Sequence, residues 1–191
     1  MNFAVLASGQ GSNLQAIIHA VKAKKIKAQL KLVISDKKDA FALERARKAK
    51  IATKVLNPKD FPDREAFDRA VLAHLKDSQI DFVVLAGYMR LLSKHFIEQY
   101  PHKILNIHPA LLPAFKGMRG IQDAFEYGVK VTGATVHLVT YEMDAGPILL
   151  QEAVKVSPKD TLETLAQKIH RVEHKLYPKA IALFISSRRG K

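Results

Sequence analysis

The sequence predicts an α/β fold in which a doubly wound, mostly parallel sheet is covered by helices on both faces. Two observations predict it. Through the first half of the chain, short apolar runs alternate with segments of helical periodicity, which is the pattern of successive β-α-β units. Glycine-rich and polar segments follow the ends of the apolar runs, where doubly wound sheets bind their ligands. We therefore expect a ligand crevice beyond the carboxyl ends of the strands.

The first strand–helix unit opens the chain directly. Phe3–Leu6 is a short apolar run and predicts a strand, and Ser8–Asn13 is a glycine-rich turn. A helix is expected from about residue 13 to residue 24, because apolar side chains recur there at helical spacing. Ser12 or Asn13 is expected to cap this helix.

Further units follow with the same alternation. Phe82–Leu85 is apolar throughout, as expected of a strand that is buried on both faces. Residues 63–76 place Phe67, Val71 and Leu75 at helical spacing and predict a helix that buries this face. The remaining strands are expected at 32–34, 53–56 and 104–108, and the remaining helices at 40–49 and 93–99.

The second half of the chain changes character. We expect a loop at 109–118, a short helix at 121–127, and two strands at 133–138 and 148–156. No long helix fits between these strands, so an antiparallel hairpin is expected. The closing helix is expected to begin near Thr161, with Asp160 or Thr161 as its cap. Its inward stripe is expected to comprise Leu162, Leu165, Ile169, Val172 and Leu176.

Length and composition limit the classes of function. At 191 residues the chain is expected to form one domain. It has no cysteine, which excludes disulfides, thiolate zinc sites and cysteine nucleophiles. No apolar run reaches the ~18 residues of a membrane span, and the start of the chain has no secretory-signal pattern, so we expect a cytoplasmic protein.

The net charge of +13 has three interpretations: a nucleic-acid partner, an anionic small substrate, or a solvated basic surface. Few aromatic residues accompany the lysines, and no platform for stacking bases is visible. We therefore expect small-molecule substrates and no nucleic-acid partner.

The turn Gly9–Asn13 is the first candidate site. Glycines let a backbone approach a ligand closely, and the free amides at the start of a helix attract anions. The order Gly-x-Gly-Ser-Asn matches neither the dinucleotide fingerprint nor the nucleoside-triphosphate loop. A single phosphate on a small substrate is the favoured ligand, and a plain tight turn is the alternative.

Asn106 and His108 form the second candidate site. They are two residues apart in a strand, so their side chains point to one face of the sheet. An amide donor beside a protonated imidazole stabilises the oxyanion that forms when an acyl carbon becomes tetrahedral. A carboxylate alongside, such as that of Asp144, favours the protonated ring. From the residues alone, a satisfied core histidine remains the alternative, and nothing places Asp144 next to His108.

Six segments carry a family resemblance, in order along nearly the whole chain. They are Val5–Ile18 (VLASGQGSNLQAII), Val84–Ser93 (VLAGYMRLLS), Ile104–Pro113 (ILNIHPALLP), Gly133–His137 (GATVH), Met143–Ile148 (MDAGPI) and Glu173–Pro178 (EHKLYP). They resemble the folate-dependent phosphoribosylglycinamide formyltransferase family. The resemblance implies a single formyltransferase-type, Rossmann-like domain over 1–191, with a substrate-phosphate-binding half at 1–100 and a catalytic and folate-binding half at 101–191.

The resemblance also implies a reaction, in which the amine of glycinamide ribonucleotide attacks the formyl carbon of 10-formyltetrahydrofolate without a metal. It implies that Asn106 and His108 stabilise the tetrahedral intermediate and that Asp144 supports the charged His108. The implied ligands of the substrate phosphate and ribose are Gly11, Ser12, Asn13 and Glu173. The implied folate-binding residues are Arg64, Met89, Arg90, Leu91, Leu92, Asn106, Thr140, Tyr141, Glu142, Met143 and Asp144.

Some of these residues have a structural alternative. From the sequence alone, Arg64 and Glu173 are favoured as solvated charges on helix surfaces, and Met89 is open to interpretation as core filler. His137 is expected either to support the site or to have a structural role. His170 and His174 are spaced like a metal-binding pair, but no third ligand supports one.

Residues 116–121 depart from the family pattern, so the conformation of that loop is left open, and Leu112–Pro113 is a candidate cis bond. The alternative functions are formyl transfer to initiator tRNA and folate deformylation, for which an additional domain is expected, and non-catalytic nucleotide binding. A homodimer is left open.

Overall fold

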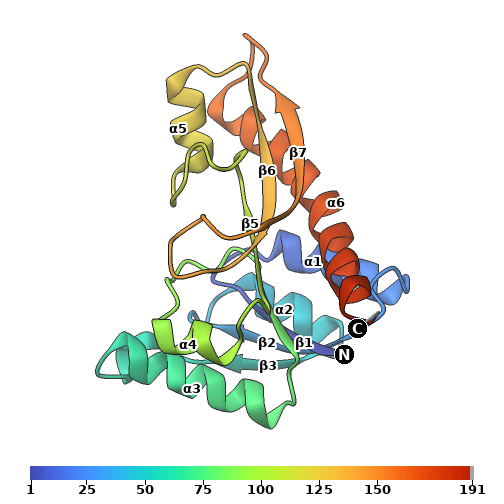
Figure 1. The fold of residues 1–191 in the computed structure, drawn as a ribbon, viewed down its shortest axis with the longest axis vertical. Coiled ribbons are helices and arrows are strands. Elements are labelled where there is room, and N and C mark those ends of the chain that lie inside the picture. Colours follow the sequence, from blue (N-terminus) through green and yellow to red (C-terminus); the bar gives the residue numbers. More distant parts are fainter. Residues whose placement is uncertain (190–191) are drawn as a thin grey trace.

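Helices and strands alternate along the chain around one seven-stranded sheet (Figure 1). The computed structural model describes residues 1–189. Its strands are β1 (Asn2–Leu6), β2 (Gln29–Ser35), β3 (Ala52–Val55), β4 (Phe82–Leu85), β5 (Ile104–His108), β6 (Val131–Leu138) and β7 (Ile148–Lys155). Its helices are α1 (Ser12–Lys22), α2 (Phe41–Lys48), the 3-10 helix η1 (Pro58–Asp60), α3 (Arg64–Asp77), α4 (Lys94–Gln99), α5 (Gly120–Tyr127) and α6 (Leu162–Arg189). No helix in this part of the chain is long and apolar enough to cross a membrane.

The strand order in the sheet is β3-β2-β1-β4-β5-β6-β7. Strands β1 to β5 are parallel, whereas β6 is antiparallel to β5 and β7 is antiparallel to β6. The prediction of a mostly parallel sheet with an antiparallel portion in the second half is confirmed. The chain builds outward from β1 to β3 and then continues on the other side of β1 with β4. Such a reversal of strand order opens a crevice at the carboxyl ends of β1 and β4.

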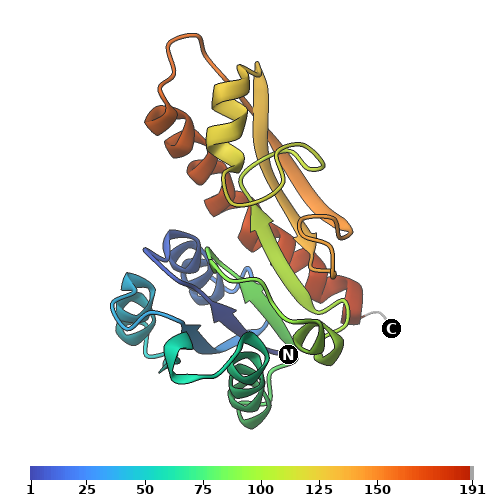
Figure 2. The same ribbon diagram turned by 90° about the vertical axis from the view of Figure 1, so that its left-hand side faces the viewer.

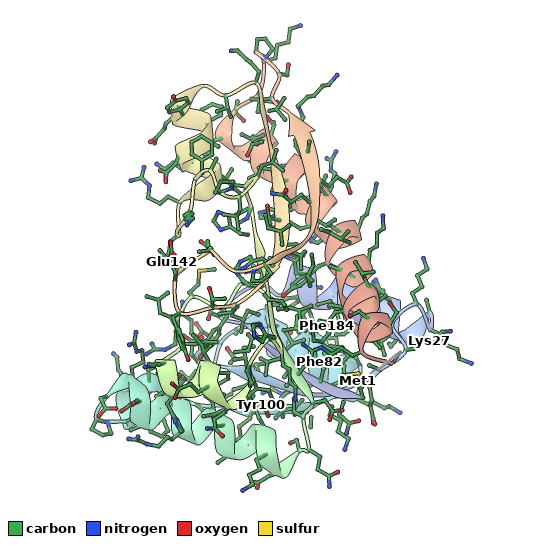
Figure 3. All side chains as sticks on the ribbon, in the orientation of Figure 1. Met1, Lys27, Phe82, Tyr100, Glu142 and Phe184 are labelled. Atoms are coloured by element: carbon green, nitrogen blue, oxygen red, sulfur yellow. The ribbon has the colours of Figure 1, made fainter. Side chains whose placement is uncertain are left out.

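Apolar side chains form a core on each face of the sheet, because both faces of a doubly wound sheet are covered by helices. Phe3 and Phe82 belong to the core under α1 and α6, and Ala4 and Val83 belong to the core under α3 and α4. The rings of Phe3 and Phe82 stack with centroids 5.0 Å apart. Phe184 of α6 lies 5.2 Å from Phe82 and anchors the last helix to the centre of the sheet (Figure 3).

The β6–β7 hairpin extends away from the parallel strands, together with α5 and the first turns of α6 (Figure 2). A small third core holds this part together, with Val154, Leu165 and Ile169 buried and with Ile121 and Phe125 packed beside them. The hairpin therefore confirms the antiparallel connection that the sequence predicts.

The start of α1 differs from the prediction. Gly11 is the N-cap, in the left-handed conformation, and among residues 1–189 no side chain makes a capping hydrogen bond there. The expectation that Ser12 or Asn13 caps this helix is wrong, because both residues already lie inside its first turn. The amides at the start of α1 consequently keep no side-chain partner within the described chain.

Other boundaries are shifted slightly. Strand β2 begins at Gln29 rather than Leu32, because the parallel pairing with β1 includes the polar start of this segment. Thr161 caps α6 as predicted, since its Oγ1 accepts a hydrogen bond from Thr164 N at 3.2 Å. Leu162 is 40% exposed, so its place in the inward stripe of α6 is wrong and the stripe begins at Leu165.

Candidate active site

The loops after β1 and β4 meet at the point where the strand order reverses. Ser8 N donates to Gly87 O at 3.0 Å, and Ser8 Oγ accepts from Met89 N at 2.9 Å. Ser8 is buried, so water does not compete for these hydrogen bonds. One serine thus joins the glycine turn to the segment Met89–Leu92, the two parts of the chain that the resemblance assigns to different substrates.

A pocket of about 460 Å³ lies beside this junction. It is lined by every residue that the resemblance implies for folate: Arg64, Met89, Arg90, Leu91, Leu92, Asn106, Thr140, Tyr141, Glu142, Met143 and Asp144. The sequence did not single out Tyr88, Lys94, Gly117, Met118 and Val139, which also line the pocket. Most of these lie in irregular segments, whose path no periodicity predicts.

Apolar side chains remain exposed around the pocket. Met89, Leu91, Met118 and Tyr141 are each more than half exposed. Met89 is therefore not core filler. Exposed apolar side chains that converge on a concave surface indicate a ligand site.

Asn106 and His108 lie on the same face of β5, as predicted, and both line the pocket. The antiparallel register of β6 places His137 opposite Asn106, with Asn106 Nδ2 3.2 Å from His137 Nε2. Asp144 reaches these residues from the loop between β6 and β7, where its φ is 51°. Its Oδ2 lies 3.3 Å from His108 Nδ1. The structure therefore brings together the three residues that the sequence leaves apart.

His108 is 4% exposed, and each of its ring nitrogens faces an acceptor. Nε2 lies 2.7 Å from Phe115 O, and Nδ1 faces the Asp144 carboxylate. A neutral imidazole has one donor and one acceptor nitrogen, so it satisfies only one of these contacts, whereas the imidazolium satisfies both. The geometry favours the protonated ring, which is the form that a general acid requires.

Asp144 collects hydrogen-bond donors from both sides. Gly117 N donates to Oδ2 at 2.9 Å, and His137 Nε2 lies 3.4 Å from Oδ1. Burial by itself raises the pKa of Asp144, but hydrogen bonds from His137 and Gly117 and the adjacent charge of the histidines lower the pKa below its ordinary value. The carboxylate is therefore ionised at neutral pH and supplies a fixed negative charge beside His108.

His137 is buried and lies next to both Asn106 and Asp144. Its Nδ1 donates to Leu138 O at 3.0 Å, and its Nε2 lies between the Asn106 amide and the Asp144 carboxylate. The ring therefore supports both of these catalytic side chains.

The segment between β5 and α5 closes over this cluster. Its Leu112–Pro113 peptide bond is cis, as predicted. Lys116 Nζ lies 3.1 Å from Glu142 Oε1 and so links the segment to the loop between β6 and β7, at the edge of the molecule where Glu142 is labelled (Figure 3). This conformation, which the sequence leaves open, places Phe115 O on His108 and Gly117 N on Asp144.

The turn Gly9–Asn13 takes its shape from Gly11. Its φ is 67°, and a Cβ at this position would lie 2.7 Å from atoms of Ala42. Only glycine fits such a combination of left-handed backbone and close approach. The helix start that follows presents amides that suit an anion.

Glu173 of α6 lies next to this turn and is 4% exposed, so the favoured interpretation of Glu173 as a solvated surface charge is wrong. It is buried because its face of α6 packs against α1, where Glu173 Oε2 accepts from Asn13 Nδ2 at 3.0 Å. His170 Nδ1 lies 2.9 Å from the same oxygen, and this hydrogen bond raises the pKa of His170. Arg64, by contrast, is exposed as expected, at the mouth of the pocket.

Comparison with known proteins agrees with this geometry. A formyl transferase family model matches residues 1–181. The chain is similar to the phosphoribosylglycinamide formyltransferase of Bacillus subtilis, at 44% identity over 94% of this chain and 92% of that protein. It is also similar to the Escherichia coli protein of that name, at 46% identity over 98% of this chain and 89% of that protein.

A solved structure is similar over the same range. The crystal structure of glycinamide ribonucleotide transformylase 1 from Symbiobacterium toebii matches with a TM-score of 0.97 and 47% identity, covering 98% of this chain and 89% of that one. The sequence match, the shared fold and the assembled Asn106–His108–Asp144 cluster agree. This protein belongs to the formyl transferase family.

Proposed function

We propose that the protein transfers the formyl group of 10-formyltetrahydrofolate to the amine of 5'-phosphoribosylglycinamide, which gives formylglycinamide ribonucleotide and tetrahydrofolate in purine biosynthesis. The observation that carries the proposal is the buried His108–Asp144 pair beside Asn106 in a pocket of about 460 Å³. The names of the Bacillus subtilis and Escherichia coli relatives, both phosphoribosylglycinamide formyltransferases, support it.

The reaction begins when the amine nitrogen attacks the formyl carbon and a new carbon–nitrogen bond forms. The formyl oxygen becomes an oxyanion, which the Asn106 amide and a His108 N–H stabilise by hydrogen bonds. The intermediate collapses when its bond to N10 of the folate breaks, and His108 donates a proton to the departing nitrogen. The attacking amine loses a proton to solvent and His108 takes one up from solvent, so atoms and charges balance.

Asp144 keeps His108 charged and oriented through this sequence. His108 Nε2 donates to Phe115 O in the present conformation, and Nδ1 faces Asp144. For Nε2 to serve the substrate, the Phe115 carbonyl must be exchanged for a substrate atom while the Asp144 contact is kept. Catalysis then replaces one hydrogen bond by another.

The two substrates are expected to bind on opposite sides of the crevice between β1 and β4, where the strand order reverses. We assign the substrate phosphate to Gly11, Ser12 and Asn13 and the ribose hydroxyls to Glu173, because these groups cluster at the start of α1. The pterin is assigned to the apolar side chains of Met89–Leu92 and the backbone of Thr140–Asp144, and the carboxylates of the folate tail to Arg64 and Arg90. A net charge of +13 favours the approach of both anionic substrates.

The test is a transfer assay with 10-formyltetrahydrofolate as donor and 5'-phosphoribosylglycinamide as acceptor. We expect formylated ribonucleotide and tetrahydrofolate in equal amounts, and no transfer to methionyl initiator tRNA. Transfer to the tRNA, or release of formate in the absence of an acceptor, would favour one of the related activities. Binding of either substrate without turnover would favour a non-catalytic protein.

Three predictions about organisation accompany this function. The division into a phosphate-binding half at 1–100 and a catalytic and folate-binding half at 101–191 stays a prediction, as do the cytoplasmic location and the homodimer. Sedimentation of the purified chain at several concentrations tests the homodimer.

A further inference from the structure

The pocket loop, which we define as Gly87–Ser93, is held by a buried carboxylate for which the proposed reaction has no use. Asp68 lies on α3 and is 2% exposed. Its Oδ2 accepts from Ser93 N at 2.6 Å. Ser93 is in turn the N-cap of α4, where its Oγ accepts from Phe96 N at 3.2 Å. Asp68 therefore determines where the pocket loop ends and α4 begins.

Two arginines that line the pocket flank this carboxylate. Arg64 lies one turn earlier on α3, and Arg90 lies in the pocket loop. The Arg90 guanidinium sits over the ring of Phe67, the neighbour of Asp68, at 4.8 Å from the ring centroid. The positive charges of Arg64 and Arg90 favour the ionised form of Asp68 and lower its pKa.

Stability alone does not explain an aspartate at this position. Burial raises the pKa of Asp68, and the hydrogen bonds from Ser93 and the charges of Arg64 and Arg90 offset that effect only in part. A buried charge that is incompletely compensated destabilises the fold relative to a neutral side chain of similar shape. The charge does strengthen the hydrogen bond from Ser93 and attract the arginines.

We propose that Asp68 is a positioning residue for the folate pocket, and that its carboxylate acts through Ser93, Arg64 and Arg90 to keep the pocket loop in its binding conformation. This rests on the proposed function, because the ligand in question is the formyl-folate co-substrate. Gly11, Asn13 and Glu173, to which the acceptor's phosphate and ribose are assigned, do not line this pocket, so the acceptor's affinity should depend on Asp68 much less than the affinity for the folate does.

The first test compares Asp68→Asn with a matched control, Asp77→Asn. Asp77 is the exposed last residue of the same helix, so its substitution removes the same charge from α3 without touching the pocket loop. We expect Asp68→Asn to raise the KM for 10-formyltetrahydrofolate about tenfold, as when a charged hydrogen-bond acceptor is neutralised. The acceptor KM and kcat should stay within about twofold, and the control should behave as wild type. Equal losses in both KM values, or an Asp68→Asn enzyme that matches the control, overturns the proposal.

The second test uses the pH dependence of stability. The titratable groups that face Asp68 are Arg64 on its own helix and Tyr88 and Arg90 on the pocket loop, and burial raises the pKa of Tyr88 as well. Among these four groups, Asp68 is therefore the one that titrates in the acid range. The pKa of Asp68 in the folded protein lies above its ordinary value of 3.8. The contribution of Asp68 to the free energy of unfolding is therefore lost as the pH rises from this ordinary value through the raised one. Wild type should gain stability relative to Asp68→Asn as the pH falls from about 6 to about 4. A Tm difference that favours wild type equally at every pH indicates a merely structural aspartate and overturns the proposal.

Calorimetric binding of tetrahydrofolate separates this proposal from the proposed function, since it needs no turnover. If wild type transfers no formyl group but Asp68→Asn weakens tetrahydrofolate binding about tenfold, the function fails and the role of Asp68 stands. If wild type is active and Asp68→Asn binds tetrahydrofolate as wild type does, the role of Asp68 fails and the function stands.

Discussion

The residues Asn106, His108 and Asp144, which we call the catalytic cluster, and the turn Gly9–Asn13, which we call the phosphate turn, both follow the carboxyl ends of parallel strands or lie beside them. They differ in how far their polar groups already have hydrogen-bond partners. In the catalytic cluster, His108 has an acceptor at each nitrogen, and Asp144 accepts from Gly117 and faces His137. At the phosphate turn, no side chain of the described residues caps α1, and Asn13 Oδ1 is buried without a partner there. A substrate that binds at the catalytic cluster must replace hydrogen bonds that already exist there. A substrate that binds at the phosphate turn supplies partners to groups that have none.

This difference indicates how the two regions divide the work. New hydrogen bonds at the phosphate turn contribute binding energy, and exchanged hydrogen bonds in the catalytic cluster contribute chiefly in the transition state. Substitutions in the catalytic cluster should therefore lower kcat, and substitutions at the phosphate turn should raise the KM for the acceptor.

The largest effect is expected for His108→Ala. The variant should lose at least about 100-fold in kcat, because the general acid and an oxyanion donor are both removed. The acceptor KM should change by no more than about threefold if the division of work holds. Steady-state kinetics with both substrates measures this, and circular dichroism controls for folding. A kcat within tenfold of wild type would break the assignment of His108.

A smaller loss of kcat, about 30-fold, is expected for Asp144→Asn, because the charged imidazole loses its carboxylate partner. Steady-state kinetics at one neutral pH measures this loss. Asp77→Asn, which removes an exposed carboxylate outside the pocket, is the matched control. A kcat within about threefold of wild type would contradict the role of Asp144.

Asp144→Asn should also change stability in a pH-dependent way. The pKa of Asp144 is lowered in the fold, so its interactions stabilise the protein above the ordinary aspartate value and are lost as the pH falls through the lowered one. The advantage of wild type over the variant in thermal melting should therefore shrink below about pH 4.

Gly11→Ala tests the phosphate turn, with Gly9→Ala as its matched control. A Cβ on Gly11 meets Ala42 at 2.7 Å on a left-handed backbone, whereas a Cβ on Gly9 meets nothing within 4 Å. Gly11→Ala should lower the free energy of unfolding by about 2 kcal/mol and raise the acceptor KM about tenfold, with a smaller effect on kcat. If both variants gave the same acceptor KM, the turn would not bind the phosphate.

The smallest effect is expected for His170→Asn. The hydrogen bond to Glu173 raises the pKa of His170, so its contribution to stability is fully present below about pH 6.5 and is lost as the pH rises through the raised value. Because the side chain is about half exposed, the gain should stay below about 1 kcal/mol. Thermal melting of both proteins from pH 6 to 9 measures it, and a difference independent of pH would contradict the charged pair.

Within the catalytic cluster, the sequence predicts the placement of the strand residues but not that of the loop residue. The alternation of apolar and polar residues in β5 predicts that Asn106 and His108 share a face, since strand geometry alone decides it. Asp144 sits at φ 51° in an irregular loop, and no local pattern determines that it meets His108. Only the family resemblance joined them.

The buried polar residues were harder to predict. In the sequence, Glu173 resembles any charged residue of a helix surface, and only the packing of α6 on α1 buries it. Ser8 likewise resembles an ordinary turn residue, and only the loop after β4 gives it a partner. A signal did exist for Asp68, because it adjoins Phe67 on the inward stripe of α3. An acidic residue beside such a stripe is buried with it and needs a hydrogen-bond donor, which Ser93 N supplies here.

The hydrogen bond between Asn13 and Glu173 also has a consequence for the nascent chain during its synthesis. It joins residues 160 positions apart, and the same helix reaches back to the centre of the sheet, where the Tyr177 hydroxyl donates to Leu85 O at 2.8 Å. The ribosome makes the glycine turn long before it makes α6. On the proposed function, a ribonucleotide finds both Asn13 and Glu173 only on a molecule whose helix α6 is synthesised and docked, so the protection that this ligand gives against unfolding and proteolysis begins only at that stage.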